Sequence, residues 1–365
     1  MRGAPVILAA VFGGGCLVDI PLPLGRSDAG SCAIVAPDSG TGCLVSTDGY
    51  NCGVCGRVCE QTQMCTEGHC SPTELVPLGY SAHETIGTAD GNIYWAVYSS
   101  FEGPAEIRRF HVDVDAATSV VTTAPQVQLM VADGDDLVFC DWHDSVFRVP
   151  LNGQNAAPEL LYQAGAEITG LWMRGGSIYV AAGTKGIVRV DRTSKEVQGF
   201  AGREEVSAIA GDATHLYWIA HLGDIYRLRR LALTEAGGQP EMVGEELPSA
   251  YRLFVGPTAV SVGAPEARRI YRIPKPGSGC APKTFELPSM PRLIIEDGPF
   301  LYVATFASGP PKYPLEGEVW RLPIAGGEPL LLLPKVASDY SGLVLHSSSL
   351  YALENDYYKM LRIPR

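Results

Sequence analysis

Two histidines of this chain lie beside carboxylates at spacings that could support acid–base or metal chemistry. His143 lies between Asp141 and Asp144, and His221 lies three residues before Asp224. Imidazole and carboxylate groups act as general acids and bases, and both can bind divalent metals. A metal site needs at least one more ligand, and the sequence identifies none. We therefore predict that both histidines lie in solvent-exposed loops, with an acid–base pair or a metal site as the alternative.

The other catalytic motifs of the sequence are equally weak. The run Asp133-Gly134-Asp135-Asp136 could bind calcium, but it offers few oxygen ligands and similar Asp/Gly turns recur along the chain. There is no Gly-x-Ser-x-Gly elbow, no His-Glu-x-x-His and no phosphate-binding glycine loop that ends in Lys-Ser/Thr. We accordingly predict no catalytic residue, no metal ligand and no cofactor.

Cysteines form the densest group of reactive side chains. Six of the ten fall within thirty residues: Cys43, Cys52, Cys55, Cys59, Cys65 and Cys70. In an exported chain such a cluster predicts three disulfides within a module too small to have its own core, at residues 42–71. Zinc is the alternative, but the second half of a zinc knuckle is missing. Neither the disulfide pairing nor the state of Cys32, Cys140 and Cys280 follows from the sequence.

The N-terminus has the pattern of an export signal. Arg2 precedes an apolar run over residues 4–12, which is too short to span a bilayer, and three glycines then precede Cys16. Small residues directly before a cysteine resemble a bacterial lipoprotein signal, in which that cysteine carries the lipid. We predict a signal peptide at residues 1–15, a lipid on Cys16 and a linker at residues 16–41, so the protein is extracytoplasmic. Plain secretion is the alternative.

Seven similar strands along the remaining chain indicate a repeat architecture. Each copy has an arginine next to branched or long apolar residues, and the arginines are 38 to 49 residues apart. The copies are Ile107-Arg108-Arg109-Phe110, Val146-Phe147-Arg148-Val149, Ile187-Val188-Arg189-Val190, Ile225-Tyr226-Arg227-Leu228, Ile270-Tyr271-Arg272-Ile273, Val319-Trp320-Arg321-Leu322 and Met360-Leu361-Arg362-Ile363. A period of this size fits four short strands per unit and predicts a β-propeller.

A second recurring segment supports the same period. A turn and an apolar strand, in most copies with a central tyrosine, precede each arginine strand. The last unit stops after its arginine strand, and a strand-like segment at residues 73–78 could supply the missing outer strand. We therefore predict an all-β fold: a seven-bladed β-propeller at residues 72–365, closed by an N-terminal outer strand and preceded by the cysteine module. Six blades remain the alternative if the divergent fifth unit is malformed.

The sequence also resembles known families. Asn51-Cys52-Gly53-Val54-Cys55-Gly56-Arg57-Val58-Cys59 and the segment up to Cys70 are similar to a cysteine module of exported myxobacterial proteins and of the plant stigma-specific family. Leu216-Tyr217-Trp218 and Val319-Trp320-Arg321-Leu322-Pro323 resemble the repeats of myxobacterial propeller lipoproteins. Residues 135–153 are more loosely similar to the YWTD propellers of lipoprotein receptors, which have six blades. The resemblance implies an exported propeller protein and assigns no catalytic residue.

The overall charge limits the range of partners. The chain has a formal net charge of −12 and no basic run, which argues against a nucleic-acid surface. We predict a monomer that touches a membrane only through its lipid.

We expect any ligand site to lie at the mouth of the propeller. A polar residue recurs nine positions before the tyrosine strand: Glu84, Gln128, Thr169, Ser207, Tyr251, Arg292 and Ser341. The loops of the same face add Trp142, His143, Lys185, His221, Phe306 and Tyr357. Aromatic side chains mixed with single charges favour a peptide or a glycan. A hydrated mouth without a ligand is the alternative.

The recurring arginines could form an anion-binding ring, but we predict a structural role. An arginine on this strand can pack its stem on the sheet and reach a carboxylate or carbonyl of the next blade. The sequence thus favours a non-enzymatic binding or scaffold protein. A carbohydrate- or peptide-processing enzyme, a hydrolase or lyase with its site in the funnel, is the second hypothesis.

Overall fold

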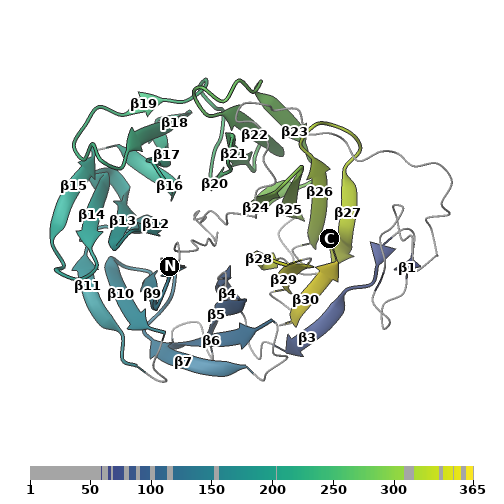
Figure 1. Cartoon of the computed structure of the whole chain (residues 1–365), viewed down its shortest axis with the longest axis horizontal. Helices are drawn as coiled ribbons and strands as arrows, with labels where there is room; N and C mark the ends of the chain where they lie inside the picture. Colours follow the sequence, from purple (N-terminus) through teal and green to yellow (C-terminus); the bar gives the residue numbers. More distant parts are fainter. Residues whose placement is uncertain are drawn as a thin grey trace, which may run out of the picture.

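The computed structural model describes residues 59, 65–66, 69–77, 82–87, 91–98, 103–112, 118–151, 156–202, 204–307, 316–336, 340–347, 349–354 and 359–364. These residues form antiparallel strands, with one short 3-10 turn at Gly183–Lys185. Seven sheets of four strands stand around a common centre (Figure 1), which confirms the predicted seven-bladed propeller.

The strands of blades 1 to 4 are given from the centre to the rim. Blade 1 contains β4 (Ala82–Gly87), β5 (Asn92–Tyr98), β6 (Ala105–His111) and β7 (Ser119–Ala124). Blade 2 contains β8 (Leu129–Asp133), β9 (Asp136–Cys140), β10 (Ser145–Pro150) and β11 (Glu159–Gln163). Blade 3 contains β12 (Ile168–Arg174), β13 (Ser177–Ala182), β14 (Ile187–Asp191) and β15 (Val197–Ala201). Blade 4 contains β16 (Glu205–Gly211), β17 (His215–Leu222), β18 (Ile225–Ala232) and β19 (Glu241–Met242).

The remaining three blades complete the ring. Blade 5 contains β20 (Arg252–Val255), β21 (Ala259–Ala264), β22 (Arg269–Pro274) and β23 (Lys283–Glu286), so the divergent fifth unit is intact. Blade 6 contains β24 (Met290–Asp297), β25 (Phe300–Ala307), β26 (Glu316–Pro323) and β27 (Leu330–Val336). Blade 7 contains β28 (Tyr340–His346), β29 (Ser349–Glu354), β30 (Lys359–Pro364) and β3 (Thr73–Pro77). We call the four strands of each blade a to d, from the centre outwards.

Blade 7 closes the ring with strands from both ends of the described chain. In Figure 1 the blue β3 lies along the yellow β30, and the two strands are antiparallel, with Thr73 opposite Arg362. An ion pair of 2.8 Å joins Glu74 to Lys359 across this junction. The predicted closure by an N-terminal outer strand is therefore confirmed, and it covers an edge of β30 that would otherwise stay open.

The hydrophobic core lies between neighbouring blades. Strand b is buried on both faces, as in β5 and β9, whereas strand c alternates between buried and half-buried residues. Trp95, Trp172 and Trp218 are among the largest fully buried side chains. One cluster joins Trp95 of blade 1 to Phe139 of blade 2 and Leu353 of blade 7. Each strand b thus contacts a blade on either side, which explains its apolar and aromatic composition.

Arginine and tyrosine face each other across strands b and c in most blades. The pairs are Tyr94–Arg109, Tyr179–Arg189, Tyr217–Arg230, Tyr302–Arg321 and Tyr351–Arg362. In blade 4 the equivalent arginine is Arg230, whereas Arg227 lies opposite Ala220. The assignment of Arg227 to the repeat was therefore wrong by three residues, because β18 carries three arginines and extends further than the motif predicted.

Most of the N-terminal predictions fall outside the described residues. These are the signal peptide at residues 1–15, the linker at residues 16–41, and Cys16, Cys43, Cys52 and Cys55. In the predicted cysteine module, β1 (Cys65–Thr66) pairs with β2 (His69–Cys70), and Cys59 and Cys65 each form a disulfide. Within the described part of the chain, no helix is long and apolar enough to cross a membrane.

Candidate functional site

The antiparallel blades give the ring two faces with different loops. The loops between strands b and c, and those from strand d to the next blade, lie on one face, which we call the b–c face. The turns between strands a and b, and between c and d, lie on the opposite face, the a–b face. Because each face collects loops from all seven blades, residues far apart in the sequence meet there.

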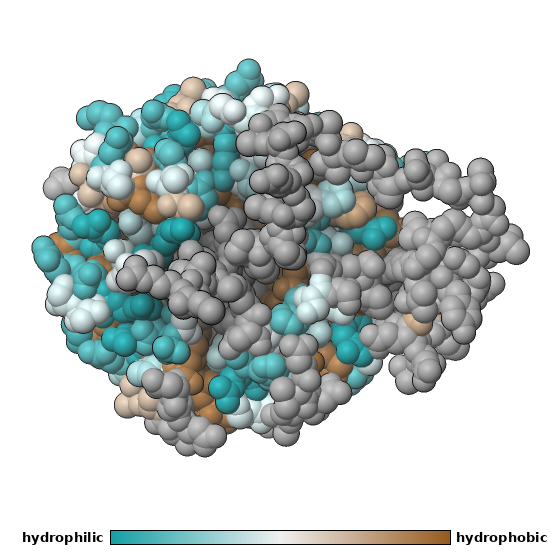
Figure 2. All heavy atoms as spheres, viewed as in Figure 1, coloured by the Kyte–Doolittle hydropathy of each residue, from teal (hydrophilic) through white to brown (hydrophobic). Residues whose placement is uncertain are grey.

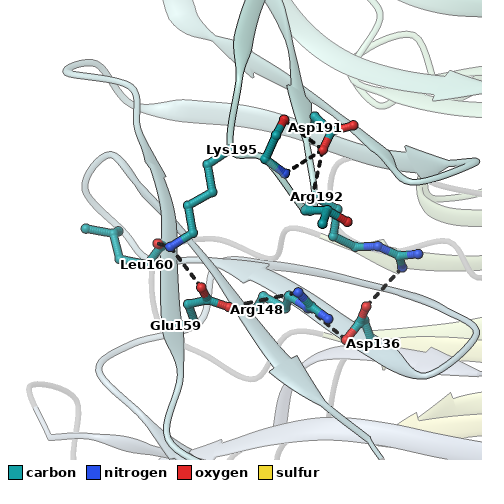
Figure 3. A network of polar contacts seen from close by, with 9 residues as sticks. Asp136, Arg148, Glu159, Leu160, Asp191, Arg192 and Lys195 are labelled. Atoms are coloured by element: carbon teal, nitrogen blue, oxygen red, sulfur yellow. Dashed lines mark hydrogen bonds and ion pairs between the residues drawn. The ribbon is translucent and has the colours of Figure 1, made fainter.

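On the a–b face, Asp136 joins blades 2 and 3 (Figure 3). Its carboxylate accepts a hydrogen bond of 2.8 Å from Arg148 Nε of the same blade and lies 3.2 Å from Arg192 Nη1 of blade 3. The Asp136 side chain is only 7% exposed, so both guanidinium groups compensate a nearly buried charge. The four-residue turn that could have bound calcium therefore uses its last carboxylate to bind arginine. No group of three potential metal ligands occurs among the residues that the structure describes.

The same network continues to the rim of blades 2 and 3. Lys195 Nζ lies 2.8 Å from Glu159 and donates to the carbonyl oxygen of Leu160 at 3.1 Å. The hydrogen bond from Lys195 lowers the pKa of Glu159, although burial opposes this shift. Asp191 accepts backbone hydrogen bonds from Thr193 and Ser194, which fold the turn and lower the pKa of Asp191. The turn places Lys195 against the neighbouring blade.

Two further ion pairs join blades on this face. Lys275 of blade 5 lies 2.7 Å from Asp212 of blade 4. Burial raises the pKa of Asp212, but the ammonium group of Lys275 and nearby backbone N–H groups outweigh it and lower this pKa to about 2. Arg272 of blade 5 binds Glu296 of blade 6 at 3.2 Å, and both side chains are less than 10% exposed. Every inter-blade ion pair that we find among the described residues lies on the a–b face.

The recurring arginines are structural, but most of them bind within their own blade. Arg189 donates to Gln198 and Arg230 to Glu241, both residues being on or beside strand d of the same blade. Arg321 lies over the Phe300 ring at 4.6 Å. Among the recurring arginines whose contacts are described, only Arg272 reaches the next blade as the sequence predicted.

On the b–c face, the predicted polar ring coincides with a series of β-bulges. A register shift in strand a leaves one residue of the ring outside the ladder in five blades: Glu84, Thr169, Ser207, Arg292 and Ser341. A bulge bends the strand and turns a side chain away from its alternating position. The apolar residues two positions later are buried: Met130, Leu171, Ile209, Leu253, Ile294 and Leu343.

Three members of the polar ring bind the following blade instead of facing an open funnel. Thr169 Oγ1 donates to the carbonyl oxygen of Val206 at 2.5 Å, and Ser207 Oγ donates to that of Ala250 at 3.4 Å. With its amide oriented to satisfy its neighbours, Gln128 donates to the carbonyl oxygen of Ile168 at 3.2 Å. Much of the predicted ring therefore connects adjacent blades.

Trp142 stands out from this face at the tip of the blade 2 loop. Asp141 Oδ1 accepts hydrogen bonds of 3.0 Å from the N–H groups of His143, Asp144 and Ser145, and these close the loop. The Trp142 side chain, at the tip, is 50% exposed. His143 is exposed as well, as we predicted for a loop histidine.

The other predicted loop residues occupy different settings. Lys185 Nζ donates to the carbonyl oxygens of Ala164 and Gly165 at 2.8 and 2.7 Å, so it stabilises a neighbouring loop. Phe306 is half-buried near the end of β25. The side chain of Glu84 and all of Tyr357 lie outside the described residues.

The most concentrated group of exposed apolar side chains lies between blades 4 and 5. His221 stacks on Tyr226 with ring centroids 4.4 Å apart, and the hydroxyl groups of Tyr226 and Tyr251 are 2.8 Å apart. Leu222 is 44%, Ile225 37% and Tyr251 38% exposed. We call these five residues the His221 patch. It combines two predicted site residues, His221 and Tyr251, with three that the sequence did not indicate. His221 lies half-buried near the end of β17, so the prediction of an exposed loop position was wrong for this histidine, because its ring stacks on Tyr226.

Local pairing explains how the patch forms. Leu222 and Ile225 face each other across the tight turn between β17 and β18, and His221 faces Tyr226 one step below. Reciprocal backbone hydrogen bonds between Tyr226 and Leu247 hold the following loop against β18 and bring Tyr251 close. Glu205 lies 3.5 Å from His221 Nδ1 at the side. Burial and the Tyr251 hydroxyl raise the pKa of Tyr226, which keeps it neutral as a hydrogen-bonding ring.

The comparisons with known proteins agree with the fold and add no function. No protein-family model matches the chain, and no curated protein matches it. A solved structure of catalytically inactive virginiamycin B lyase from Staphylococcus aureus with quinupristin is similar at a TM-score of 0.61 and 12% identity, covering 81% of this chain and 98% of that chain. The WD40 β-propeller domain of Doa1 is similar at 0.58 and 12%, covering 81% and 97%. The computationally designed Ika8 protein is similar at 0.56 and 12%, covering 80% and 99%. At this identity the likeness shows a propeller fold alone.

Proposed function

We propose that the protein is an exported binding or scaffold propeller, lipid-anchored through Cys16, that docks a peptide or a glycan on its b–c face. The carrying observation is the His221 patch, where exposed aliphatic and aromatic side chains gather on a rigid hairpin. Such clusters are uncommon on monomer surfaces unless they bind something. The rings of His221 and Tyr251 offer stacking area and polar edges, which suit sugar rings and peptide side chains alike, and the buried Tyr226 supports them from below.

The rest of the surface supports a local site of this kind. In the view of Figure 2 the described rim is mostly hydrophilic, and hydrophobic residues reach the surface in small, separate patches. A chain with a net charge of −12 and a hydrophilic rim fits a protein that meets its partner through one confined patch. Export, the lipid and the cysteine module come from the sequence pattern and belong to the same proposal.

The enzyme hypothesis has less support from the described residues. His221 and Glu205 form an acid–base contact, but a hydrolase or lyase also needs a nucleophile, a second carboxylate or a metal at the same place. A second carboxylate, Glu266 in the b–c turn of blade 5, lies close enough to raise the pKa of Tyr226, but among the described residues we find no contact between Glu266 and His221. The proposal therefore builds on binding.

A screen with matched variants tests the proposal. The full-length protein would be probed against glycan and peptide arrays, and any ligand measured by calorimetry with Tyr251→Ala and Trp142→Ala. We expect Tyr251→Ala to weaken binding by about tenfold or more, on the order of 1–2 kcal/mol. Leu160→Ala is the control, because Leu160 is similarly exposed at 49% but lies on the rim strand β11. Normal ligand binding by both variants would place the site elsewhere.

A further inference from the structure

Cys280 lies far from the cysteine module in the sequence, yet it is disulfide-bonded. It belongs to the turn between β22 and β23 in blade 5, on the a–b face. The sequence left the state of this residue open. Its bond raises the question of which part of the chain is attached there.

The turn that carries Cys280 is held firmly by both neighbouring blades. At its start, Lys275 forms the ion pair of 2.7 Å with Asp212 of blade 4. At its end, Lys283 Nζ donates to the carbonyl oxygen of Ile324 in blade 6 at 2.7 Å. Gly277 and Gly279 adopt positive φ angles of 82° and 70° and allow the tight path between these anchors. Cys280 is thus a fixed attachment point.

The partner of Cys280 must come from the N-terminal part of the chain. Of the other nine cysteines, only Cys140 lies after residue 70. Cys140 is fully buried at the end of β9 in blade 2, next to the loop between strands b and c, while Cys280 lies in the turn between strands c and d of blade 5, on the opposite face. Two cysteines of a disulfide have Cα atoms within about 7 Å of each other, which this separation excludes.

We propose that Cys280 is bonded to Cys32 and that this disulfide ties the N-terminal linker to the propeller. The six clustered cysteines can form three pairs among themselves, and two of them, Cys59 and Cys65, each form a disulfide. The Cys16 sulfur carries the lipid thioether and cannot form a disulfide, a step that rests on the proposed function. Cys32 is the remaining cysteine of the N-terminal part.

The chemistry needs an oxidant of the cell envelope. The two thiols lose two protons and two electrons as the S–S bond forms, and an external disulfide oxidant accepts them and becomes a dithiol. Such oxidants act in extracytoplasmic compartments, where disulfides persist.

The disulfide would also orient the protein on a membrane. Sixteen residues separate Cys16 from Cys32, a reach of at most about 55 Å, whereas an untethered chain up to β3 could reach about 200 Å. The short connection leads to the a–b face. It therefore keeps the lipid within about 55 Å of this face, which favours an orientation with the b–c face and the His221 patch directed away from the membrane.

Peptide mapping of the full-length protein, purified without reductant, tests the proposal. Cleavage before aspartate and after lysine or arginine isolates Cys32 in peptide 28–37 and Cys280 in peptide 273–283. We expect one species that joins the two peptides and separates on reduction. In Cys32→Ser, Cys280 should then be recovered as an alkylated thiol, whereas the control Cys140→Ser should keep the joined peptide.

The other possible results of the peptide mapping would contradict part of the proposal. A thiol at Cys280 in the native protein would refute the tether, and a bond from Cys280 to a cysteine of residues 43–70 would refute the choice of Cys32. The joined peptide together with an unmodified Cys16 would support the tether and overturn the proposed lipid anchor. Loss of ligand binding in Tyr251→Ala addresses the proposed function independently of this disulfide.

Discussion

The two faces of the propeller use their charged and apolar side chains in opposite ways. On the a–b face, charges pair across blade boundaries, as Asp136 with Arg192, Asp212 with Lys275, and Arg272 with Glu296. On the b–c face, the described ion pairs stay within one blade, as Arg227 with Glu246. That face also exposes the His221 patch and Trp142. The a–b face joins the blades through charge pairs, whereas the b–c face joins them through uncharged hydrogen bonds and also exposes the patch that we propose binds a ligand.

The difference between the two faces follows from the different constraints on their loops. Turns between strands a and b are short and must fit against the next blade, so their residues are selected for contact with it. Loops between strands b and c end in solvent, and their tips can change without disturbing the ring. The comparison predicts that substitutions on the a–b face reduce stability and that substitutions on the b–c face reduce binding.

The largest effect should come from the strand that closes the ring. Deleting residues 72–80 removes β3, its ladder to β30 and the half-buried Leu75, and it leaves the β30 edge open. We expect a loss on the order of 5 kcal/mol, equivalent to a fall in Tm of roughly 10 °C or more. Calorimetry would measure it, with deletion of residues 17–25, equally long, as the control. Equal melting temperatures for the two deletions would contradict the closure.

The buried inter-blade pair should come next. Glu296→Gln leaves the nearly buried guanidinium group of Arg272 without its counter-charge and should cost about 3 kcal/mol. The matched control is Glu241→Gln, because Glu241 pairs with Arg230 within one blade and is 64% exposed. This exposed pair should contribute less than about 1 kcal/mol. Chemical denaturation would give the free energy of unfolding of both variants. Equal losses would show that inter-blade pairs do not stabilise the protein more than pairs within a blade.

A smaller effect should appear in acid. The folded-state pKa of Asp212 is lowered from 3.8 to about 2. The protein is therefore stabilised by this group at pH values above its unfolded-state pKa, and the stabilisation is lost as the pH falls through about 2. The difference corresponds to about 2 kcal/mol. Asp212→Asn should flatten the stability profile between about pH 4 and pH 2, measured by denaturation at each pH. An unchanged slope would show that Lys275 does not lower the pKa of Asp212 in the folded protein.

Much of the fold could be predicted because short residue patterns that recur along the chain define the repeat. Tyr–Arg pairs recur in five of the seven blades, and the missing last strand could be found at the front of the chain. The strand register inside blade 4 could not be predicted from the sequence. Arg227, Arg229 and Arg230 all fit a strand of alternating burial, and only the pairing of Tyr217 with Arg230 shows which one belongs to the repeat.

The candidate site was less predictable, because it depends on geometry that composition does not encode. A bulge changes where a side chain points without changing the residue pattern, so Thr169 and Ser207 looked like a funnel lining although they bind the next blade. His221 and Tyr251 are thirty residues apart, and their proximity requires the loop that Leu247 holds against β18. The apolar turn of Leu222 and Ile225 was the one available signal for the patch.

The smallest effect on stability should come from that turn, and it is the sharpest test of the comparison. Leu222→Ser with Ile225→Ser removes two exposed apolar side chains that contact mainly each other at the tip of the hairpin. Because both residues are already partly exposed to water, their loss should change the free energy of unfolding by less than about 0.5 kcal/mol. Ligand affinity should nevertheless fall about tenfold, since apolar area is lost from the centre of the patch. Denaturation and calorimetry on the same preparation measure both, with Met242→Ser on the rim as the control. If the free energy of unfolding fell by as much as the free energy of binding, the two residues would stabilise the fold, and the b–c face would not differ from the a–b face.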